Sequence, residues 1–227
     1  VIPDGVTSIG KEAFFWCSLT SVTIGNGVTS IGSGAFNSAG INRVDIVDLA
    51  KWCNITFGNT YSNPAAGCGL YLNGSLIEDL VIPNKVSYVS DYAFHYNTKL
   101  KTITFENGSL CEGIYVSTFA SCINVTTVTL PSGLFHIDES AFENCRNLTN
   151  IVVPECVTFI GSKAFADCNS LQSITLPFTG DGEGETHFGY IFGAEEISGQ
   201  NSFIPSSFNM TFIENKSFFI IISINCK

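Results

Sequence analysis

Residues 152–165 read VVPECVTFIGSKAF, and near copies of this stretch recur along the chain. The other copies are VIPDGVTSIGKEAF at 1–14, TIGNGVTSIGSGAF at 23–36, VIPNKVSYVSDYAF at 81–94, TLPSGLFHIDESAF at 129–142 and a longer version, TFENGSLCEGIYVSTF, at 104–119. Where no insertion intervenes, the closing phenylalanines are 22, 25, 23 and 23 residues apart. They are Phe14, Phe36, Phe94, Phe119, Phe142 and Phe165. This regularity predicts a chain wound into stacked coils, because one such unit cannot bury its apolar face alone.

The apolar positions of each unit follow L-x-x-V-x-I-P-x-x-V-x-x-I-x-x-x-A-F-x-x-C. The alternating V-x-I pair indicates a short strand, and the proline or glycine after it ends the strand and begins a turn. A period near 23 is typical of leucine-rich repeats. We therefore expect a mainly β, right-handed leucine-rich-repeat solenoid in which the repeated phenylalanines stack into one elongated apolar column.

The VIPxxVTSIGxxAFxxC pattern resembles the BspA-like leucine-rich repeats of surface proteins from host-associated bacteria and some protozoan parasites. The resemblance covers about three quarters of the chain, and six copies agree at many positions. It implies parallel β-sheets and a secreted or surface-anchored protein whose role is adhesion to host or matrix proteins. It brings no catalytic residues, because the family motif is a packing motif.

Composition and charge narrow the class of partner. The chain has 227 residues, 45% of them apolar, and a net charge of −10. Such a charge repels nucleic acid and anionic lipid headgroups, and no apolar run has the length of a membrane helix. Val1 already lies inside a repeat, so we expect a piece of a longer protein, extracellular or at the cell surface. We also expect it to be monomeric.

Four segments of one continuous solenoid are expected: regular repeats at 1–43, an irregular repeat with an insertion at 44–80, regular repeats at 81–177 and an atypical segment at 178–227. Within the insertion, Asp48 can cap a short helix running through Leu49, Ala50 and Trp52. The sequence LYLNGSLI predicts a hairpin with Asn73-Gly74 in a type I′ turn.

The insertion also supplies candidate contact residues. One interpretation is that it packs on a small apolar cluster of its own. The other is that Trp52, Tyr61, Tyr71 and Leu72 each expose part of their area to a partner.

Two interpretations also exist for the segment after Pro177. Asp181, Glu183 and Glu185 alternate with glycines, which weakly suggests a calcium loop, although a solvated loop explains them as well. The aromatic group that follows, His187, Phe188, Tyr190 and Phe192, is either a binding edge or a plug that closes the core.

The nine cysteines show no metal-binding spacing and no catalytic context. Cys17, Cys122, Cys145 and Cys168 each follow a repeat phenylalanine by three residues. They are therefore predicted to be core residues, although a Cys145–Cys168 disulfide has a feasible spacing. We expect no cofactor and no resident metal ion.

A non-catalytic binding module is the first functional hypothesis, with a host or cell-surface protein or glycan as its partner. A structural stalk that spaces other domains is the second. The stalk hypothesis is favoured by outward positions on the regular coils, which read mostly as Ser, Thr, Asn and Gly without an aromatic stripe. An enzyme is a distant third hypothesis. It is retained because solenoid stacking can still bring distant carboxylates together.

Overall fold

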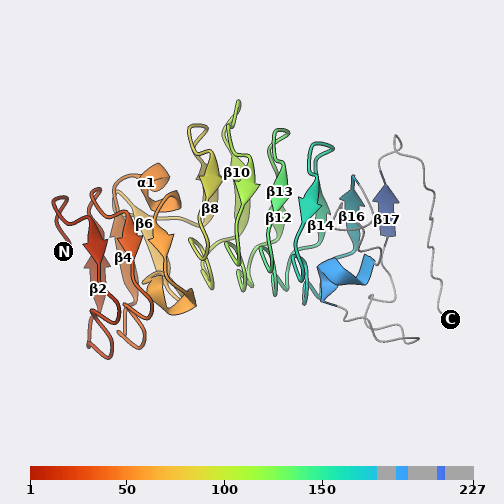
Figure 1. Ribbon diagram of the computed structural model, residues 1–227. Coiled ribbons are helices and arrows are strands. Elements are labelled where there is room, and N and C mark those ends of the chain that lie inside the picture. Colours follow the sequence, from red (N-terminus) through yellow and green to blue (C-terminus); the bar gives the residue numbers. More distant parts are fainter. Residues whose placement is uncertain (178–187, 194–208, 213–227) are drawn as a thin grey trace.

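The computed structural model describes residues 1–177, 188–193 and 209–212. The chain winds into coils that stack along one axis, with the first coil at one end of the stack (Figure 1). Almost every strand pairing is parallel and joins one coil to the next. The expected mainly β solenoid of parallel sheets is confirmed.

One side of the solenoid is built from the strand that the V-x-I pair predicts. Its strands are β2 (Ser21–Thr23), β4 (Arg43–Ile46), β6 (Gly69–Leu72), β8 (Asp79–Ile82), β10 (Thr102–Phe105), β12 (Thr127–Val128), β14 (Asn150–Val152), β16 (Ser173–Leu176) and β17 (Asn209–Phe212). Together with β7 (Ser75–Leu76) they form two sheets, in the orders β2-β4-β6-β7 and β17-β16-β14-β12-β10-β8. Ile103 pairs with Leu80 on one side and Val128 on the other, so equivalent aliphatic side chains stack in register.

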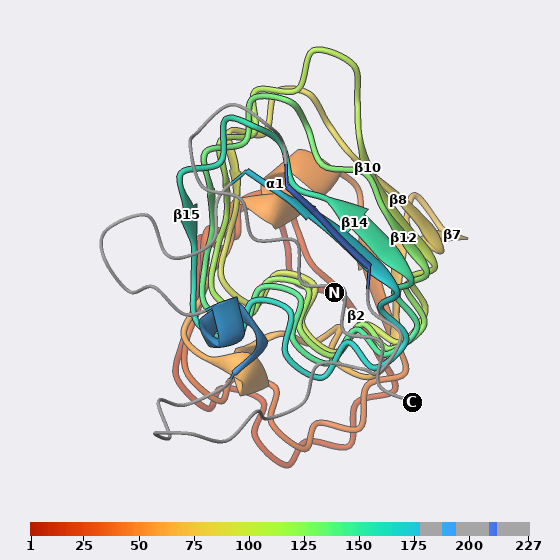
Figure 2. The ribbon, with the colours of Figure 1, turned by 90° about the vertical axis from the view of Figure 1, so that its right-hand side faces the viewer.

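The opposite side of each coil is a shorter strand at the V-T-S-I-G positions, as the end-on view shows for β15 and β14 (Figure 2). These strands are β1 (Ser8–Ile9), β3 (Ser30–Ile31), β5 (Thr56–Phe57), β9 (Tyr88–Val89), β11 (Gly113–Ile114), β13 (His136–Ile137) and β15 (Phe159–Ile160). They also form two sheets, β1-β3-β5 and β15-β13-β11-β9. Both faces of the solenoid are therefore interrupted at the same place along the axis.

The turn that carries the repeated phenylalanine is held by a ladder of backbone hydrogen bonds with one direction. The amides of Ser117, Phe119 and Ser121 donate to carbonyls of the following coil at 2.9, 2.9 and 2.7 Å. Ser117 and Ser121 both have positive φ, 50° and 62°. Because the residues on either side of the phenylalanine have left-handed backbone, every second amide is directed toward the next coil. The N–H groups of this ladder therefore point toward the C-terminal end of the stack.

The phenylalanines form the predicted column. Phe94, Phe119, Phe142 and Phe165 stack with centroid separations of 5.4, 5.4 and 5.7 Å and interplanar angles of 16° or less. At the N-terminal end Phe14 and Phe36 form a separate stacked pair at 5.0 Å. The column is broken where the sheets are broken.

The segment 44–80 resolves into one complete coil followed by a hairpin. Val44 pairs with Leu70, so β4 and β6 are successive first strands. Between them lie α1 (Leu49–Cys53), capped by Asp48 as predicted, β5 and the 3-10 helix η1 (Thr60–Ser62). Strand β7 (Ser75–Leu76) then pairs antiparallel with β6. Asn73 and Gly74 have φ of 51° and 83°, which confirms the predicted type I′ turn.

The interruption of both faces divides the coils into two stacks, one before β8 and one that begins with β8. Side chains replace the backbone ladder where these two stacks meet. The Trp52 indole Nε1 and the Asn63 amide Nδ2 both donate to the carbonyl oxygen of Ala93, at 2.9 and 3.0 Å. The Ser90 amide, which by register would bond to β5, donates instead to Cys53 at the end of α1. The first coils consequently lie displaced from the later ones (Figure 2).

Candidate binding surface

Trp52 is not available to a partner. Its side chain is 1% exposed, it packs edge-on against Phe57 at 5.4 Å, and its indole nitrogen is committed to Ala93. The expectation that Trp52 exposes part of its area is therefore wrong. Nor does Trp52 sit in a separate apolar cluster of the insertion, because it belongs to the one core that runs through the solenoid.

The two tyrosines of the insertion lie on different sides of the coil. Tyr61 belongs to η1, at the turn side, and is 60% exposed. Tyr71 lies on β6 and is half-buried, with the Arg43 guanidinium 4.0 Å above its ring. Arg43 is held there by two hydrogen bonds to Asp45, of 2.8 and 2.7 Å. The structure therefore does not combine Tyr61 and Tyr71 into one site, and Leu72 next to Tyr71 packs partly against the core.

The described part of the C-terminal segment closes the core. The 3-10 helix η2 (Phe188–Phe192) continues the turn ladder, since Lys163 donates to the carbonyl of Tyr190 and Phe165 to that of Ile191. Phe192 extends the phenylalanine column, with its ring 6.5 Å from that of Phe165. Tyr190 and Phe192 pack against the core. The candidate calcium residues Asp181, Glu183 and Glu185, together with His187, lie outside the described residues, and of Phe188 only the backbone is described.

Four aromatic side chains line the outer face of the sheet β9-β11-β13-β15. We call Tyr88, Tyr115, His136 and Phe159 the aromatic row. The Tyr88 and Tyr115 rings are 5.4 Å apart, and those of Tyr115 and His136 are 5.1 Å apart. Strand register places Phe159 directly beside His136. Tyr88 and Phe159, at the two ends of the row, are 39% and 38% exposed. Contiguous exposed apolar patches mark interaction sites.

Gly113 makes the row continuous. It occupies the same outward position as Tyr88 and His136 in the neighbouring strands. A Cβ atom at this position would collide with the His136 imidazole, which therefore lies over the glycine. Tyr115, two residues further on, then contacts both neighbours. A side chain at position 113 would separate the rings.

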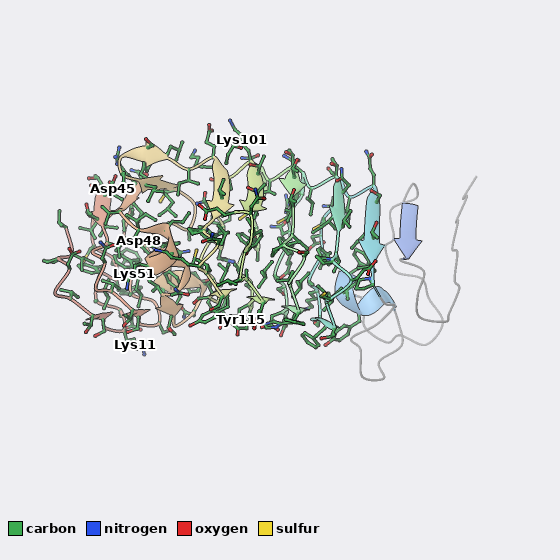
Figure 3. The ribbon with its side chains drawn as sticks, turned by 90° about the horizontal axis from the view of Figure 1, so that it is seen from above. Lys11, Asp45, Asp48, Lys51, Lys101 and Tyr115 are labelled. Atoms are coloured by element: carbon green, nitrogen blue, oxygen red, sulfur yellow. The ribbon has the colours of Figure 1, made fainter. Side chains whose placement is uncertain are left out.

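Carboxylates flank the row. Burial raises the pKa of Asp138 above its usual value, and the nearby Asp91 adds to this while His136 opposes it. Burial also raises the pKa of Tyr115, with contributions from Asp138, Tyr88 and Asp91. Asp91 accepts a hydrogen bond from the Val116 amide at 2.9 Å. The surface thus combines polarisable rings with negative charge. In the top view Tyr115 lies at the opposite margin from Lys101, which precedes β10 on the other sheet (Figure 3).

The aromatic row corrects the expectation that the outward positions carry no aromatic stripe. That expectation holds for the β1-β3-β5 sheet, where the corresponding residues are Ser8, Ser30 and Thr56. It fails for the later coils. The signal was present in the sequence, because aligning the repeats places Tyr88, His136 and Phe159 in the Ser position of V-T-S-I-G.

The described cysteines show no catalytic arrangement. All eight of them are free, and the thiols of Cys122, Cys145 and Cys168 donate to phenylalanine carbonyls of the preceding coil. Burial raises the pKa of both Cys122 and Cys168 to about 12. Among the described residues no three His, Cys, Asp or Glu side chains are grouped so that they could hold a metal ion. Nor does any helix in this part of the chain have the length and apolarity to cross a membrane.

Comparison with solved structures finds bacterial leucine-rich-repeat proteins. A leucine-rich cell surface protein from Faecalibacterium prausnitzii A2-165 is 32% identical, with a TM-score of 0.51 over 78% of this chain and 44% of that one. The pneumococcal vaccine antigen PcpA has a TM-score of 0.58 at 18% identity, over 91% of this chain and 54% of that one. The chain thus spans about half the length of each. A comparison with curated proteins gives no match.

The sequence itself matches a family model in six copies over residues 1–63 and 69–191. These ranges include the coils from β1 to η2 and exclude the short segment between η1 and β6 and the residues after 191, among them β17. The chain therefore belongs to the family of BspA type leucine-rich repeat regions.

Proposed function

We propose that this chain is a non-catalytic adhesion module, at the cell surface or secreted, that docks a partner protein on the aromatic row. The observation that carries the proposal is the row of rings on one sheet, in which Tyr88, Tyr115 and His136 are in contact and Phe159 lies beside His136 in strand register. Aromatic side chains dominate the binding energy of protein interfaces, because they bury a large area at low cost in conformational entropy. Rigid parallel strands hold these rings in place before a partner arrives.

Charge favours a partner surface with basic side chains. Asp91 and Asp138 flank the rings, and the chain as a whole carries a charge of −10. A cationic side chain can lie over the face of Tyr88 or Tyr115 while pairing with these carboxylates. Long-range attraction between an acidic module and a basic partner also raises the association rate.

The test uses beads coated with the full chain and surfaces coated with extracellular-matrix or host cell-surface proteins. Tyr115→Ala and Tyr88→Ala should each reduce adhesion about tenfold or more, since an interface aromatic contributes about 2 kcal/mol or more when it is a hot spot. Trp16→Ala is the matched control, because Trp16 is 74% exposed but lies in the first coil, away from the row. Equal adhesion by all four proteins would contradict the proposal.

A second variant tests the arrangement of the rings without removing one. Gly113→Ser restores the residue that the repeat pattern places at this position, and its side chain must displace the His136 imidazole. Adhesion should fall while the unfolding temperature changes little, because the imidazole lies at the surface. Unchanged adhesion by Gly113→Ser would mean that the continuity of the row is irrelevant.

The structural stalk is the alternative, and the other face of the solenoid favours it. Outward residues of β10 and β12, such as Thr102, Thr104 and Thr127, are small and polar. A stalk predicts that coated beads adhere to none of the tested proteins. Adhesion that depends on Tyr115 therefore separates the two functions.

A further inference from the structure

A second surface feature lies at the junction of the two stacks, on the turn side and away from the aromatic row. In the first coil the amides of Trp16 and Leu19 donate to Asn37 and Ala39 of the next coil, at 3.1 and 2.8 Å. The equivalent amides of that next coil belong to Ser38 and Ile41. Neither has an acceptor within the described part of the chain.

The interruption has a local cause. The third coil should supply the accepting carbonyls, but its residues after η1 fold into a tight turn of their own. The Asn63 carbonyl accepts from Ala66, and the Asn63 side chain is directed to the fourth coil, where it bonds to Tyr92 and Ala93. Two donors of the ladder are consequently left facing the space where the next rung is missing.

That space is a pocket of about 380 Å³. Its volume lies within the range of about 300 to 1,000 Å³ that is usual for small-molecule sites. Asn37, Ser38 and Ile41 line it together with Tyr61 and Tyr96. Both tyrosines are exposed, at 60% and 47%. The Tyr96 ring is close against Gly67, whose φ of +80° and missing side chain leave room for it.

The chemistry of the lining excludes charged ligands. It contains no Asp, Glu, Lys or Arg side chain, and burial lowers the pKa of His95, which also lines the pocket, so its imidazole is neutral at pH 7. A charged ligand would lose hydration there without gaining an opposite charge. A ligand that fits must be neutral, must accept hydrogen bonds from amides and must present a face to aromatic rings.

A sugar ring meets these conditions better than a peptide does. The C–H bonds on the face of a pyranose carry a partial positive charge, which suits the negative face of a tyrosine ring. The backbone of the broken ladder offers only N–H donors, because the carbonyls of the residues between these donors point toward the preceding coil. An added peptide strand would find no backbone acceptors of this ladder for its own N–H groups, only side-chain oxygens such as those of Asn37, Ser38 and Thr60. Hydroxyl groups rotate and can serve as acceptors toward Ser38 and Ile41.

We propose that this junction pocket is a binding site for a neutral saccharide unit, with Tyr61 and Tyr96 as stacking platforms and the Ser38 and Ile41 amides as donors to its hydroxyl oxygens. The site is independent of the aromatic row. It adds a glycan-binding activity to the protein-docking function proposed above.

Two-dimensional 1H–15N NMR of the full chain tests the proposal, with glucose, galactose, mannose and N-acetylglucosamine as separate probes. At least one of them should produce saturable shifts that include the Ser38 and Ile41 amides. Tyr61→Ala and Tyr96→Ala should each weaken binding by up to about tenfold, since an aromatic contact contributes about 0.5 to 1.5 kcal/mol. Leu110→Ser, at a residue that is 64% exposed on the other stack, is the control and should leave binding unchanged.

Gly67→Ala provides a variant that keeps every ligand-contacting side chain. It displaces the Tyr96 ring and should weaken saccharide binding while the amide spectrum of the remaining coils stays native. Absence of saturable shifts with all four sugars overturns the proposal. So does binding of glucuronate as tight as that of glucose, or saturable shifts at Ser38 and Ile41 with trialanine in place of sugar. Adhesion of Tyr115→Ala beads is measured separately, so failure of this site leaves the docking function untouched.

Discussion

The Cys145 thiol donates a hydrogen bond across a coil boundary to the carbonyl oxygen of Phe119, with 3.3 Å between sulfur and oxygen. Cys122 and Cys168 make the same bond to Phe94 and Phe142. Each thiol thus satisfies a carbonyl at the inside of the turn. The Cys145–Cys168 disulfide that spacing allowed does not form in this arrangement, since both residues are free.

Reactivity of the cysteines should follow this geometry. Burial raises the pKa of Cys145 well above its ordinary value, so almost no thiolate exists at pH 8. Cys156 is exposed. Iodoacetamide should label Cys156 within minutes and leave Cys122, Cys145 and Cys168 unmodified until the protein unfolds, as followed by peptide mass spectrometry. Comparable labelling rates for Cys145 and Cys156 in the native state would contradict the thiol ladder.

The phenylalanine column should dominate stability in its interior. Phe142 is fully buried between Phe119 and Phe165, and Phe142→Ala should lower the free energy of unfolding by about 3 to 5 kcal/mol. Phe14 lies at the end of the stack and is only partly buried, so Phe14→Ala should lower the free energy of unfolding by clearly less. Urea unfolding of the two variants gives both values. Equal losses would contradict the expectation that burial inside the column sets the cost.

Repetition decided which parts of this structure were predictable. Phe142 and Cys145 occupy positions that recur in several copies, so the sequence contains its own alignment and the column follows from it. Trp52 and Asn63 occur once, in the insertion, and no internal copy shows that their side chains replace a missing rung of the ladder. The helix and hairpin were nevertheless predictable, because capping by Asp48 and the Asn73-Gly74 turn are local signals.

The aromatic row was missed for a different reason. Tyr115 does not occupy the repeat position of Tyr88, His136 and Phe159, and only the absence of a side chain at Gly113 brings it between them. The pocket at the junction was equally hidden, because it results from hydrogen bonds that are not formed. Contacts of this kind depend on the relative placement of coils, which a single-coil pattern does not contain.

The shared acceptor at the junction predicts a non-additive pair. Trp52→Phe and Asn63→Ala each remove one donor to the Ala93 carbonyl and leave the other in place. The double variant leaves this buried carbonyl without either, which costs about 1 to 3 kcal/mol beyond the sum of the single changes. Urea unfolding of the four proteins gives the coupling energy. A coupling near zero would show that the two donors do not share Ala93.

Left-handed residues in the ladder turns predict a stabilising substitution. Asp167 is exposed and has φ of 56°, a conformation that costs an L-residue about 1 to 2 kcal/mol. Asp167→Gly removes this cost but adds about 0.5 to 1 kcal/mol of entropy in the unfolded chain. We expect a net gain of up to about 1 kcal/mol, measured by urea unfolding, since Asp tolerates this conformation better than most L-residues. In another turn of the ladder a left-handed position is already a glycine, Gly34, with φ of 67°. The control is Glu155→Gly, at an exposed turn residue without positive φ, which should not stabilise.

Acidification should distinguish Asp138 from its exposed neighbours. Its pKa is raised in the folded protein, chiefly by burial, so the charged form is disfavoured by folding. This cost is absent below the ordinary aspartate pKa of about 4 and is complete once the pH exceeds the raised folded value. Asp138→Asn should therefore raise the urea midpoint at pH 7 and give no gain at pH 3. The Asp138 side chain makes no hydrogen bond within the described residues that asparagine would lose. Glu139→Gln, at an exposed carboxylate of the same turn, is the control for the change in net charge. A gain for Asp138→Asn that is equal at both pH values would mean that charge burial is not its cause.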